Sequence, residues 1–259
     1  MGNKNNYTLG DRMKEYENVS NIRLIRNMPV VIRLDMCAGH TFTRGFVKPF
    51  DSIYMKTMQQ TMEALCKEIA GTVFGYTQSD EITLVLCDYK NMETSPWFDN
   101  RVQKMCSVSA SKTGRFFNKF FKQNVEELIK QNPDEDYSLY VSRFDSADFD
   151  SRVFNVPKFD VVNAVLWRQK DAERNSVQML AQSLYKHREL EGINCNDLQN
   201  KMFTEKGINW SELPTPCKRG SACIKDADGK WFIDYDMPII GKQRDYVDSL
   251  INFNEFEVD

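Results

Sequence analysis

The chain has 259 residues, of which 41% are hydrophobic and 12% aromatic, enough for one large domain or for a core domain with an appended one. Its formal net charge of −3 excludes a globally basic nucleic-acid-binding protein, so any RNA contact has to come from local basic faces. The presence of only two histidines argues against a zinc site built from several of them.

The cysteines and the hydropathy pattern indicate the compartment. Seven cysteines, an odd number without any Cys-x-x-Cys pair, are typical of a reducing environment and not of a disulfide framework. There is no run of 18 apolar residues, and the first residues do not resemble a signal peptide. We therefore expect a cytoplasmic protein, or one of another reducing intracellular compartment, with no membrane partner.

The predicted elements alternate in a recognisable order. Apolar periodicity and turn residues predict, in chain order, a short helix, a strand, a loop, a long helix, a two-stranded hairpin, a second long helix and a strand stopped by Pro157. These elements occupy residues 9–17, 30–34, 36–50, 51–69, 73–87, 101–122 and 149–156. From residue 30 on, the order strand, helix, strand, strand, helix, strand is that of a ferredoxin-like split βαβ unit.

This order predicts an α+β fold. We expect a ferredoxin-like polymerase palm, with an antiparallel sheet and helices on one face, by analogy with nucleotide polymerases and cyclases. Residues 1–157 would form this palm-like catalytic domain. Residues 158–259 would form a mainly helical C-terminal region, with helices near 160–185 and 196–203 and two short strands at 221–225 and 230–235.

Two groups of carboxylates lie at strand ends. Asp35 ends the first strand, and Asp80 and Glu81 occupy the tip of the hairpin. Asp35 alone is equally typical of a turn after a strand, and Asp80-Glu81 alone of a hairpin tip. In a split βαβ order, however, the two groups come together, and such paired carboxylates suit two Mg²⁺ ions that bind substrate phosphates.

The second long helix is unusually basic. Between residues 101 and 122 it contains six Lys or Arg residues and no acid. At 100° per residue these six cations fall within about 80° of one another; they are Arg101, Lys104, Lys112, Arg115, Lys119 and Lys122. Such a stripe is more often a solvated face, but a triphosphate held near the metal ions would also need these cations.

Several motifs together resemble one family. They are Arg33-Leu-Asp35, His40-Thr-Phe-Thr43, Lys48-Pro-Phe-Asp51, Tyr76-Thr-Gln-Ser-Asp-Glu81, Asn100-Arg101 with Lys104, Phe149-Asp-Ser-Arg-Val153, Trp167-Arg-Gln169 with Asp171, and Cys217-Lys-Arg-Gly220. In this order and spacing, from Leu9 to about Lys225, the chain resembles the tRNA(His) guanylyltransferase superfamily. Its members are nucleotidyltransferases that add nucleotides in the 3′–5′ direction.

The chain departs from the family pattern at two places, and the second of them separates the family's branches. Met36-Cys37 stands where the family usually has Gly-Arg. Residues 173–179 stand where true tRNA(His) guanylyltransferases carry a His-Ile-Asn-Asn-Leu-Tyr-Asn run. Residues 185–190 and 207–210 are instead similar to the bacterial and archaeal-type branch, which implies template-dependent repair of 5′-truncated tRNA.

The resemblance implies a two-metal centre. Asp35, the Met36 carbonyl and Asp80 would hold two Mg²⁺ ions, and Glu81 would be a further ligand or a partner behind the ligands. Asp35, Asp80 and Glu81 are therefore the predicted catalytic residues. Activation of the RNA 5′ end as an adenylate by ATP, with ATP and GTP as nucleotides, is also implied.

The resemblance also assigns binding roles. The predicted nucleotide-binding residues are Met36, Cys37, Ala38, Gly39, His40, Lys48, Asp51, Ser79, Arg101, Lys104, Ser107 and Ser111. The predicted RNA-binding residues, for the acceptor stem and 5′ end of tRNA, are Arg152, Arg168, His187, Lys218 and Arg219. A homotetramer is implied, with the C-terminal region contributing RNA contacts and assembly.

Other interpretations stay open. Within the family, the alternative is addition of G−1 to tRNA(His). Outside it, a catalytically inactive tRNA-binding protein is disfavoured by the intact Asp35, Asp80 and Glu81. A cyclase or a 5′–3′ polymerase is disfavoured by the Trp167-Arg-Gln169 and Lys218-Arg-Gly220 segments. His40 is also typical of an ordinary loop residue, and Lys48–Asp51 of a helix start.

Overall fold

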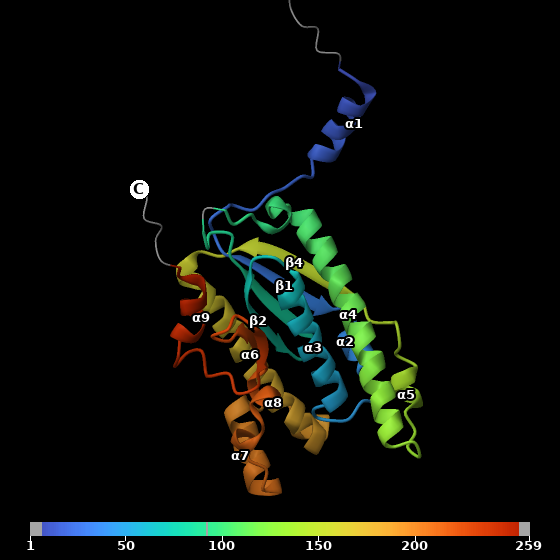
Figure 1. Cartoon of the computed structure of the whole chain (residues 1–259). Helices are drawn as coiled ribbons and strands as arrows, with labels where there is room; N and C mark the ends of the chain where they lie inside the picture. Colours follow the sequence, from blue (N-terminus) through green and yellow to red (C-terminus); the bar gives the residue numbers. More distant parts are fainter. Residues whose placement is uncertain (1–6, 92, 254–259) are drawn as a thin grey trace, which may run out of the picture.

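The computed structural model describes residues 7–91 and 93–253. Six antiparallel strands form a single sheet in the order β4-β1-β3-β2-β5-β6. Helices cover both of its faces, and α1 extends away from the body of the molecule (Figure 1). The strands are β1 (Val30–Met36), β2 (Thr72–Gln78), β3 (Glu81–Leu86), β4 (Phe149–Asn155), β5 (Ser221–Lys225) and β6 (Trp231–Asp234).

The first four strands confirm the ferredoxin-like prediction. The chain passes from β1 through helix α3 (Ser52–Glu68) to the hairpin β2–β3, and then through helix α4 (Val102–Gln131) to β4. This is a split βαβ unit, which places β1 in the centre between β4 and β3. The strand that carries Asp35 is therefore hydrogen-bonded on both edges.

One face of the sheet is covered by α3 and α4. Ile32 and Leu34 of β1 point to this face and are fully buried. They meet an aromatic cluster in which Phe117 lies 5.5 Å from Phe42 and 5.7 Å from Phe121 between ring centroids. Helix α2 (Gly39–Phe42) and helix α5 (Ser138–Val141) border the same cluster.

Helix α4 is longer than predicted. The sequence analysis ended this helix at Lys122 and expected a polar stretch to residue 136, whereas α4 continues to Gln131. The extra turns form because Val125 is completely buried against the core and Asn124 Nδ2 donates hydrogen bonds to Thr57 and Gln60 of α3.

The opposite face is covered by the C-terminal region. Helix α6 (Lys158–Leu184) packs Val161 and Val165 against Phe74, Tyr76 and other sheet residues, together with helix α9 (Asp245–Ile251). The two strands predicted at 221–225 and 230–235 do form, as β5 and β6, and they extend the palm sheet beyond β2. The expectation of helices on one face thus describes α3 and α4, and α6 adds a second layer (Figure 1).

The remaining elements pack against the C-terminal half of α6. Helix α7 (Cys195–Lys206) and helix α8 (Thr215–Arg219) follow it, with 3₁₀ turns at His187–Glu189 and Trp210–Glu212. Leu180 and Ala181 of α6 and Leu198 and Met202 of α7 form a small separate core. A further 3₁₀ turn at Trp97–Asn100 precedes α4.

Helix α1 (Leu9–Asn18) buries none of its residues. Its first turn is closed by a capping box, in which Thr8 Oγ1 accepts from the Asp11 amide and the Asp11 carboxylate accepts from the Thr8 amide. Nothing else in the described chain packs over its apolar residues, and Leu9 and Tyr16 are 74% and 62% exposed.

Candidate active site

Three carboxylates form a row across neighbouring strands. In the sheet register, Asp35 of β1 is opposite Glu81 of β3 on one side and opposite Asp150 of β4 on the other. Residues directly opposite one another in antiparallel strands project to the same face, here the face that α6 partly covers. The row lies at the C-terminal end of β1, so its side chains are close to the end of the strand and not in the middle of the sheet.

The tight β2–β3 turn brings a fourth carboxylate to this row. Only Ser79 and Asp80 separate the two strands, and Ser79 adopts the left-handed φ of 49°. The Met36 amide donates a hydrogen bond to the Asp80 carbonyl at 3.0 Å, which fixes the tip of the hairpin against the end of β1. The turn therefore brings Asp80 beside Asp35, as the sequence analysis predicted.

A glycine makes room for the Asp80 carboxylate. A Cβ atom on Gly39 would lie 2.3 Å from Asp80 Oδ2, far inside van der Waals contact. The preceding residue, Ala38, has a left-handed φ of 52° that turns the chain into α2. Residues 37–40, which are among the predicted nucleotide-binding residues, are thus held against Asp80 through Gly39.

The electrostatics of Asp35 reflect this crowding of negative charge. Partial burial raises the pKa of Asp35, and the neighbouring charges of Asp80 and Asp150 raise it further, against smaller opposing effects of Arg152 and Arg33. Below the row, burial and the charges of Asp80 and Asp35 raise the pKa of the Tyr54 hydroxyl. The site therefore holds more negative charge than its own cations neutralise.

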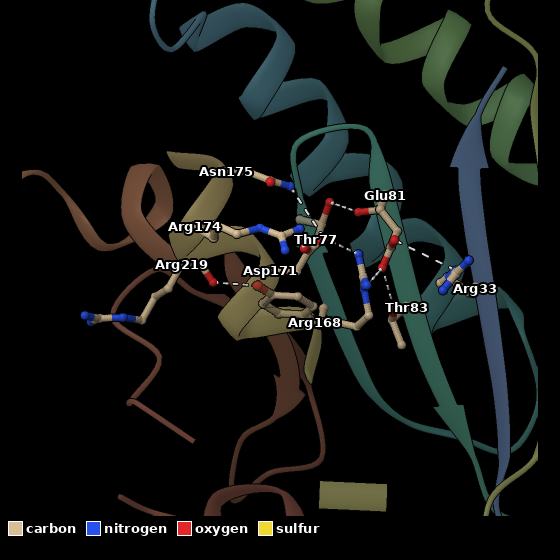
Figure 2. A network of polar contacts seen from close by, with 10 residues as sticks. Arg33, Thr77, Glu81, Thr83, Arg168, Asp171, Arg174, Asn175 and Arg219 are labelled. Atoms are coloured by element: carbon tan, nitrogen blue, oxygen red, sulfur yellow. Dashed lines mark hydrogen bonds and ion pairs between the residues drawn. The ribbon is translucent and has the colours of Figure 1, made fainter. Parts of the chain in front are cut away.

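Glu81 has a different environment. Its carboxylate is 5% exposed and accepts hydrogen bonds from Arg168 Nε at 2.7 Å and from Thr83 Oγ1 at 3.3 Å (Figure 2). Arg33 Nε lies 3.9 Å from its other oxygen. Burial raises the pKa of Glu81, and Arg168 opposes this shift. Of the two roles predicted for Glu81, these contacts favour the partner behind the metal ligands.

The Arg168 guanidinium connects α6 to the sheet. It donates to Glu81 of β3 and, through Nη2, to Asp171 one turn further along α6 at 2.9 Å (Figure 2). Its side chain is 10% exposed. The sequence analysis proposed Arg168 for RNA binding, whereas its charge is already paired with two carboxylates inside the protein.

A cavity of about 390 Å³ opens beside Asp80. Its walls come from the loop after α2, the start of α3, the hairpin tip, α6 and α8. The predicted site residues that line it are Gly39, His40, Lys48, Asp51, Ser79, Asp80 and Lys218. Sequence reasoning missed the α3 and α6 residues of the wall, which include Tyr54, Gln59, Asn175 and Ser176, because only the fold brings α6 to this place.

Asp51 at the cavity wall is already engaged. Its side chain caps α3 by accepting from the Tyr54 amide at 2.8 Å, and it also accepts from the Val47 amide and from the Tyr140 hydroxyl at 2.5 Å. The alternative interpretation of Lys48–Asp51 as a helix start therefore holds for the Asp51 carboxylate.

The predicted phosphate-binding residues of the basic helix lie elsewhere. Arg101, Lys104, Ser107 and Ser111 are at the N-terminal end of α4, and none of them lines the cavity. Further along the stripe, Lys112 and Arg115 pair with Glu68 of α3. Part of the stripe thus pairs with α3, which differs both from a solvated face and from a phosphate-binding surface.

The other predicted RNA-binding residues are dispersed. Arg152 is exposed on β4 and is opposite Arg33 in the register, next to the carboxylate row. Lys218 reaches the cavity, and Arg219 donates to Glu173 of α6 at 3.2 Å. His187 is exposed in the turn after α6 and does not line the cavity.

The residues fit a divalent cation that binds together with substrate. Among residues 7–91 and 93–253, no three His, Cys, Asp or Glu side chains are arranged to hold a metal ion by themselves. Mg²⁺, however, is usually held by one or two carboxylates plus substrate phosphates. Asp35, whose pKa is raised by burial and by neighbouring carboxylates, and Asp80, which lines the open cavity, match this mode of binding.

Comparison with known protein families and proteins shows which family the chain resembles. Residues 10–157 match the family model described as tRNA(His) guanylyltransferase. An uncharacterised protein of Acanthamoeba polyphaga mimivirus is 30% identical over 226 residues, which are 83% of this chain and 76% of that protein.

Solved structures agree with this match. A bacterial tRNA(His) guanylyltransferase-like protein in complex with ATP superposes with a TM-score of 0.83 and 39% identity, over 95% of this chain and 100% of that one. A bacterial tRNA(His) guanylyltransferase-like protein in complex with GTP gives a TM-score of 0.74 and 33% identity over the same shares of the two chains.

The palm-like sheet with its paired carboxylates and the cavity beside them defines a nucleotidyltransferase. The chain belongs to the tRNA(His) guanylyltransferase family and has a guanylyltransferase-like function in tRNA processing. In the described part of the chain, no helix is both long and apolar enough to cross a membrane.

Proposed function

We propose that the protein is a template-dependent 3′–5′ nucleotidyltransferase that adds nucleotides to the 5′ end of truncated tRNA. The observation that carries this proposal is the pair Asp35 and Asp80 beside a cavity of about 390 Å³, which is within the usual size range of ligand sites. The absence of the His-Ile-Asn-Asn-Leu-Tyr-Asn run supports repair over G−1 addition.

Asp35, Asp80 and the main-chain carbonyl of Met36 would hold two Mg²⁺ ions. When bound, these ions would lower the pKa of an attacking hydroxyl and neutralise negative charge on the phosphates. Glu81 would keep the row in place from behind, since Arg168 and Thr83 fix its carboxylate. The charge that raises the pKa of Asp35 in the free protein would then be compensated.

The cavity would receive the activating nucleotide. Tyr54, Met55, Met58 and Met179 give it apolar walls for a base, and ATP is the nucleotide in the first of the related structures. The phosphates would then extend towards residues 37–40 at Asp80, with Lys48 at the wall as a counter-charge. Arg101, Lys104, Ser107 and Ser111 on α4 would contact the phosphates of the second nucleotide.

The reaction has two transfers. In the first, an oxygen of the RNA 5′-monophosphate attacks the α-phosphorus of ATP, pyrophosphate leaves, and the 5′ end becomes an adenylate. In the second, the 3′-hydroxyl of the incoming nucleotide attacks the 5′-phosphorus and AMP leaves. Pairing with the opposite strand of the acceptor stem would select the nucleotide, so the protein would recognise A-form shape and not sequence.

The C-terminal region, residues 158–259, would contribute RNA contacts and assembly. With a formal net charge of −3, a single chain should need the cations of other subunits to build a basic RNA track. A homotetramer would combine the cations of several subunits along one tRNA. This would give an acidic protein the local positive potential that RNA binding requires.

The test uses 5′-³²P-labelled tRNA that lacks its first nucleotide, incubated with Mg²⁺, ATP and each nucleoside triphosphate in turn. Extension is expected only with the nucleotide complementary to the opposite base. In a matched tRNA with a different opposite base, the nucleotide accepted should change accordingly. Extension by G alone, whatever the opposite base, or only on full-length tRNA(His), would assign the protein to G−1 addition.

A further inference from the structure

An exposed tryptophan lies beside the carboxylate row. Trp167 of α6 is 56% exposed, although Val165, Arg168 and Gln169 around it are buried. Single exposed aromatic residues are common on protein surfaces, so exposure alone carries no meaning. The Trp167 ring, however, is surrounded by two arginine side chains.

Two guanidinium groups lie close to the Trp167 ring. The Cζ atom of Arg168 is 4.5 Å and that of Arg33 is 5.7 Å from the ring centroid. Arg168 is fixed by Glu81 and Asp171, which also limits where the adjacent Trp167 can move. Arg33 is held less firmly, because its buried Nε makes no hydrogen bond within the described residues and is 3.9 Å from Glu81. The ring is therefore attached to the wall of the site and not to a mobile loop.

The sheet register places this ring next to the reacting end of the site. Arg33 and Asp35 are two residues apart on β1, so their side chains share a face about 7 Å apart along the strand. Arg152 of β4 is opposite Arg33 on that face and is exposed. Trp167 thus lies against Arg33, which is one strand repeat from Asp35 and opposite the exposed Arg152.

We propose that Trp167 is a stacking platform for a nucleobase at the carboxylate row, with Arg152 and Arg33 as phosphate contacts. A rigid, half-exposed indole beside arginines is suited to bases, because every base has a π-face and every nucleotide has a phosphate. The base comes either from the end of the RNA acceptor stem or from the incoming nucleotide. This inference rests on the proposed function, because it assumes that RNA and nucleoside triphosphate meet at Asp35.

The test measures stacking without turnover. One probe is an RNA acceptor-stem hairpin with 2-aminopurine at its 5′-terminal position, and the other is 2-aminopurine riboside triphosphate alone. Each is titrated with the full-length protein in the absence of a second nucleotide. Stacking on Trp167 quenches the fluorescence of the probe whose base occupies the platform, so the two arms identify the source of the base.

Variants of one helix provide the controls. Trp167→Ala is expected to remove the quenching and to weaken Kd roughly 5- to 150-fold, as expected for the loss of one base–aromatic stack. Trp167→Phe should retain most of the quenching and of the affinity. Trp167→Leu, which keeps the bulk of the side chain without the π-face, should lose both. Phe159→Ala, which removes a 77% exposed aromatic from the first turn of α6, should leave both unchanged.

Quenching and affinity that are the same in Trp167→Ala and wild type, for both probes, would overturn the proposal. A shift of Trp167→Ala to a smaller species in sedimentation, with unchanged quenching, would instead assign the ring to an interface between copies of the chain. Failure of templated extension would refute the proposed function but leave this binding result readable, because no step of it requires catalysis.

Discussion

The two faces of strand β1 carry different kinds of side chain. Towards α3 and α4, the alternate residues of β1 are Ile32 and Leu34, packed against a closed aromatic cluster. Towards α6, β1 presents Arg33, whose Nε lies 3.9 Å from a Glu81 carboxylate oxygen, and Asp35, which belongs to the open carboxylate row. Because strand residues alternate between faces, one strand supplies both stability and chemistry.

The two faces therefore contribute differently to the free energy of folding. On the α3–α4 face, burial of apolar side chains stabilises the fold. On the α6 face, burial raises the pKa of Asp35 and of Glu81, so each charge costs free energy that apolar burial on both faces of the sheet has to offset. The following variants test this division, from the largest expected effect to the smallest.

Asp80→Asn should abolish transfer, with a loss of about 10³-fold or more in kcat/KM, because one of the two carboxylates proposed to bind Mg²⁺ loses its charge. The matched control is Asp150→Asn, an exposed carboxylate in the same row that is not proposed as a ligand. It should reduce activity less than about tenfold. Similar losses in both variants would mean that the row acts only through its summed charge.

Phe117→Ala should destabilise the protein by about 3–5 kcal/mol, since it empties the centre of the aromatic cluster. Phe117 is completely buried and contacts Phe42, Tyr54, Phe121 and Phe149. Phe159→Ala, the exposed aromatic of α6, should change the free energy of unfolding by less than about 0.5 kcal/mol. Urea denaturation of both variants checks this contrast, and equal effects would contradict it.

Arg168→Met should destabilise the protein by about 3 kcal/mol, because Glu81 would remain buried without its partner. In the double variant Arg168→Met with Glu81→Met, most of this loss should be recovered, since no unpaired buried charge remains. A double-mutant cycle by urea denaturation measures the coupling. A double variant that is less stable than Arg168→Met would show that the pair stabilises the fold outright.

Asp35→Asn should raise the free energy of unfolding at pH 7 while abolishing activity. The pKa of Asp35 is raised in the folded protein, so folding favours its protonated form, and the charged form destabilises the fold above that pKa. The gain should shrink as the pH falls and the wild-type carboxyl becomes protonated. Urea denaturation at pH 7 and pH 4 tests this, and a variant that is less stable at pH 7 would contradict it.

The fold and the position of the carboxylates could be predicted because their signals are local. The order of strands and helices follows from apolar periodicity, and Asp35 and Asp80 lie next to the turns that end their strands. Even the short strands β5 and β6 were predicted, because a turn at residues 226–229 separates them. Their pairing with β2 was not predicted, since it depends on tertiary packing.

The surroundings of the site could not be predicted. The burial of Arg168 beside Glu81 depends on where α6 crosses the sheet, and residues 87 positions apart in the chain have no local signal for contact. The C-terminal turns of α4 were missed because Lys130 and Gln131 are polar, while the contacts of Val125 and Asn124 that stabilise this part of the helix are tertiary. Asp51 was predicted both as part of a helix start and as a nucleotide-binding residue. Only the contacts of its two carboxylate oxygens show that it caps α3.

Helix α1 stands apart from both faces, and this has a consequence for the energetics of the chain. A helix of 10 residues that buries no side chain is stabilised by little more than its own capping box, and isolated helices of this length are marginal in water. In the single chain its amide hydrogens should therefore exchange with solvent almost as fast as those of an unfolded peptide, while those of β1 exchange only on global unfolding. Helix α1 is thus thermodynamically independent of the sheet, and its sequence can change without altering the stability of the rest of the fold.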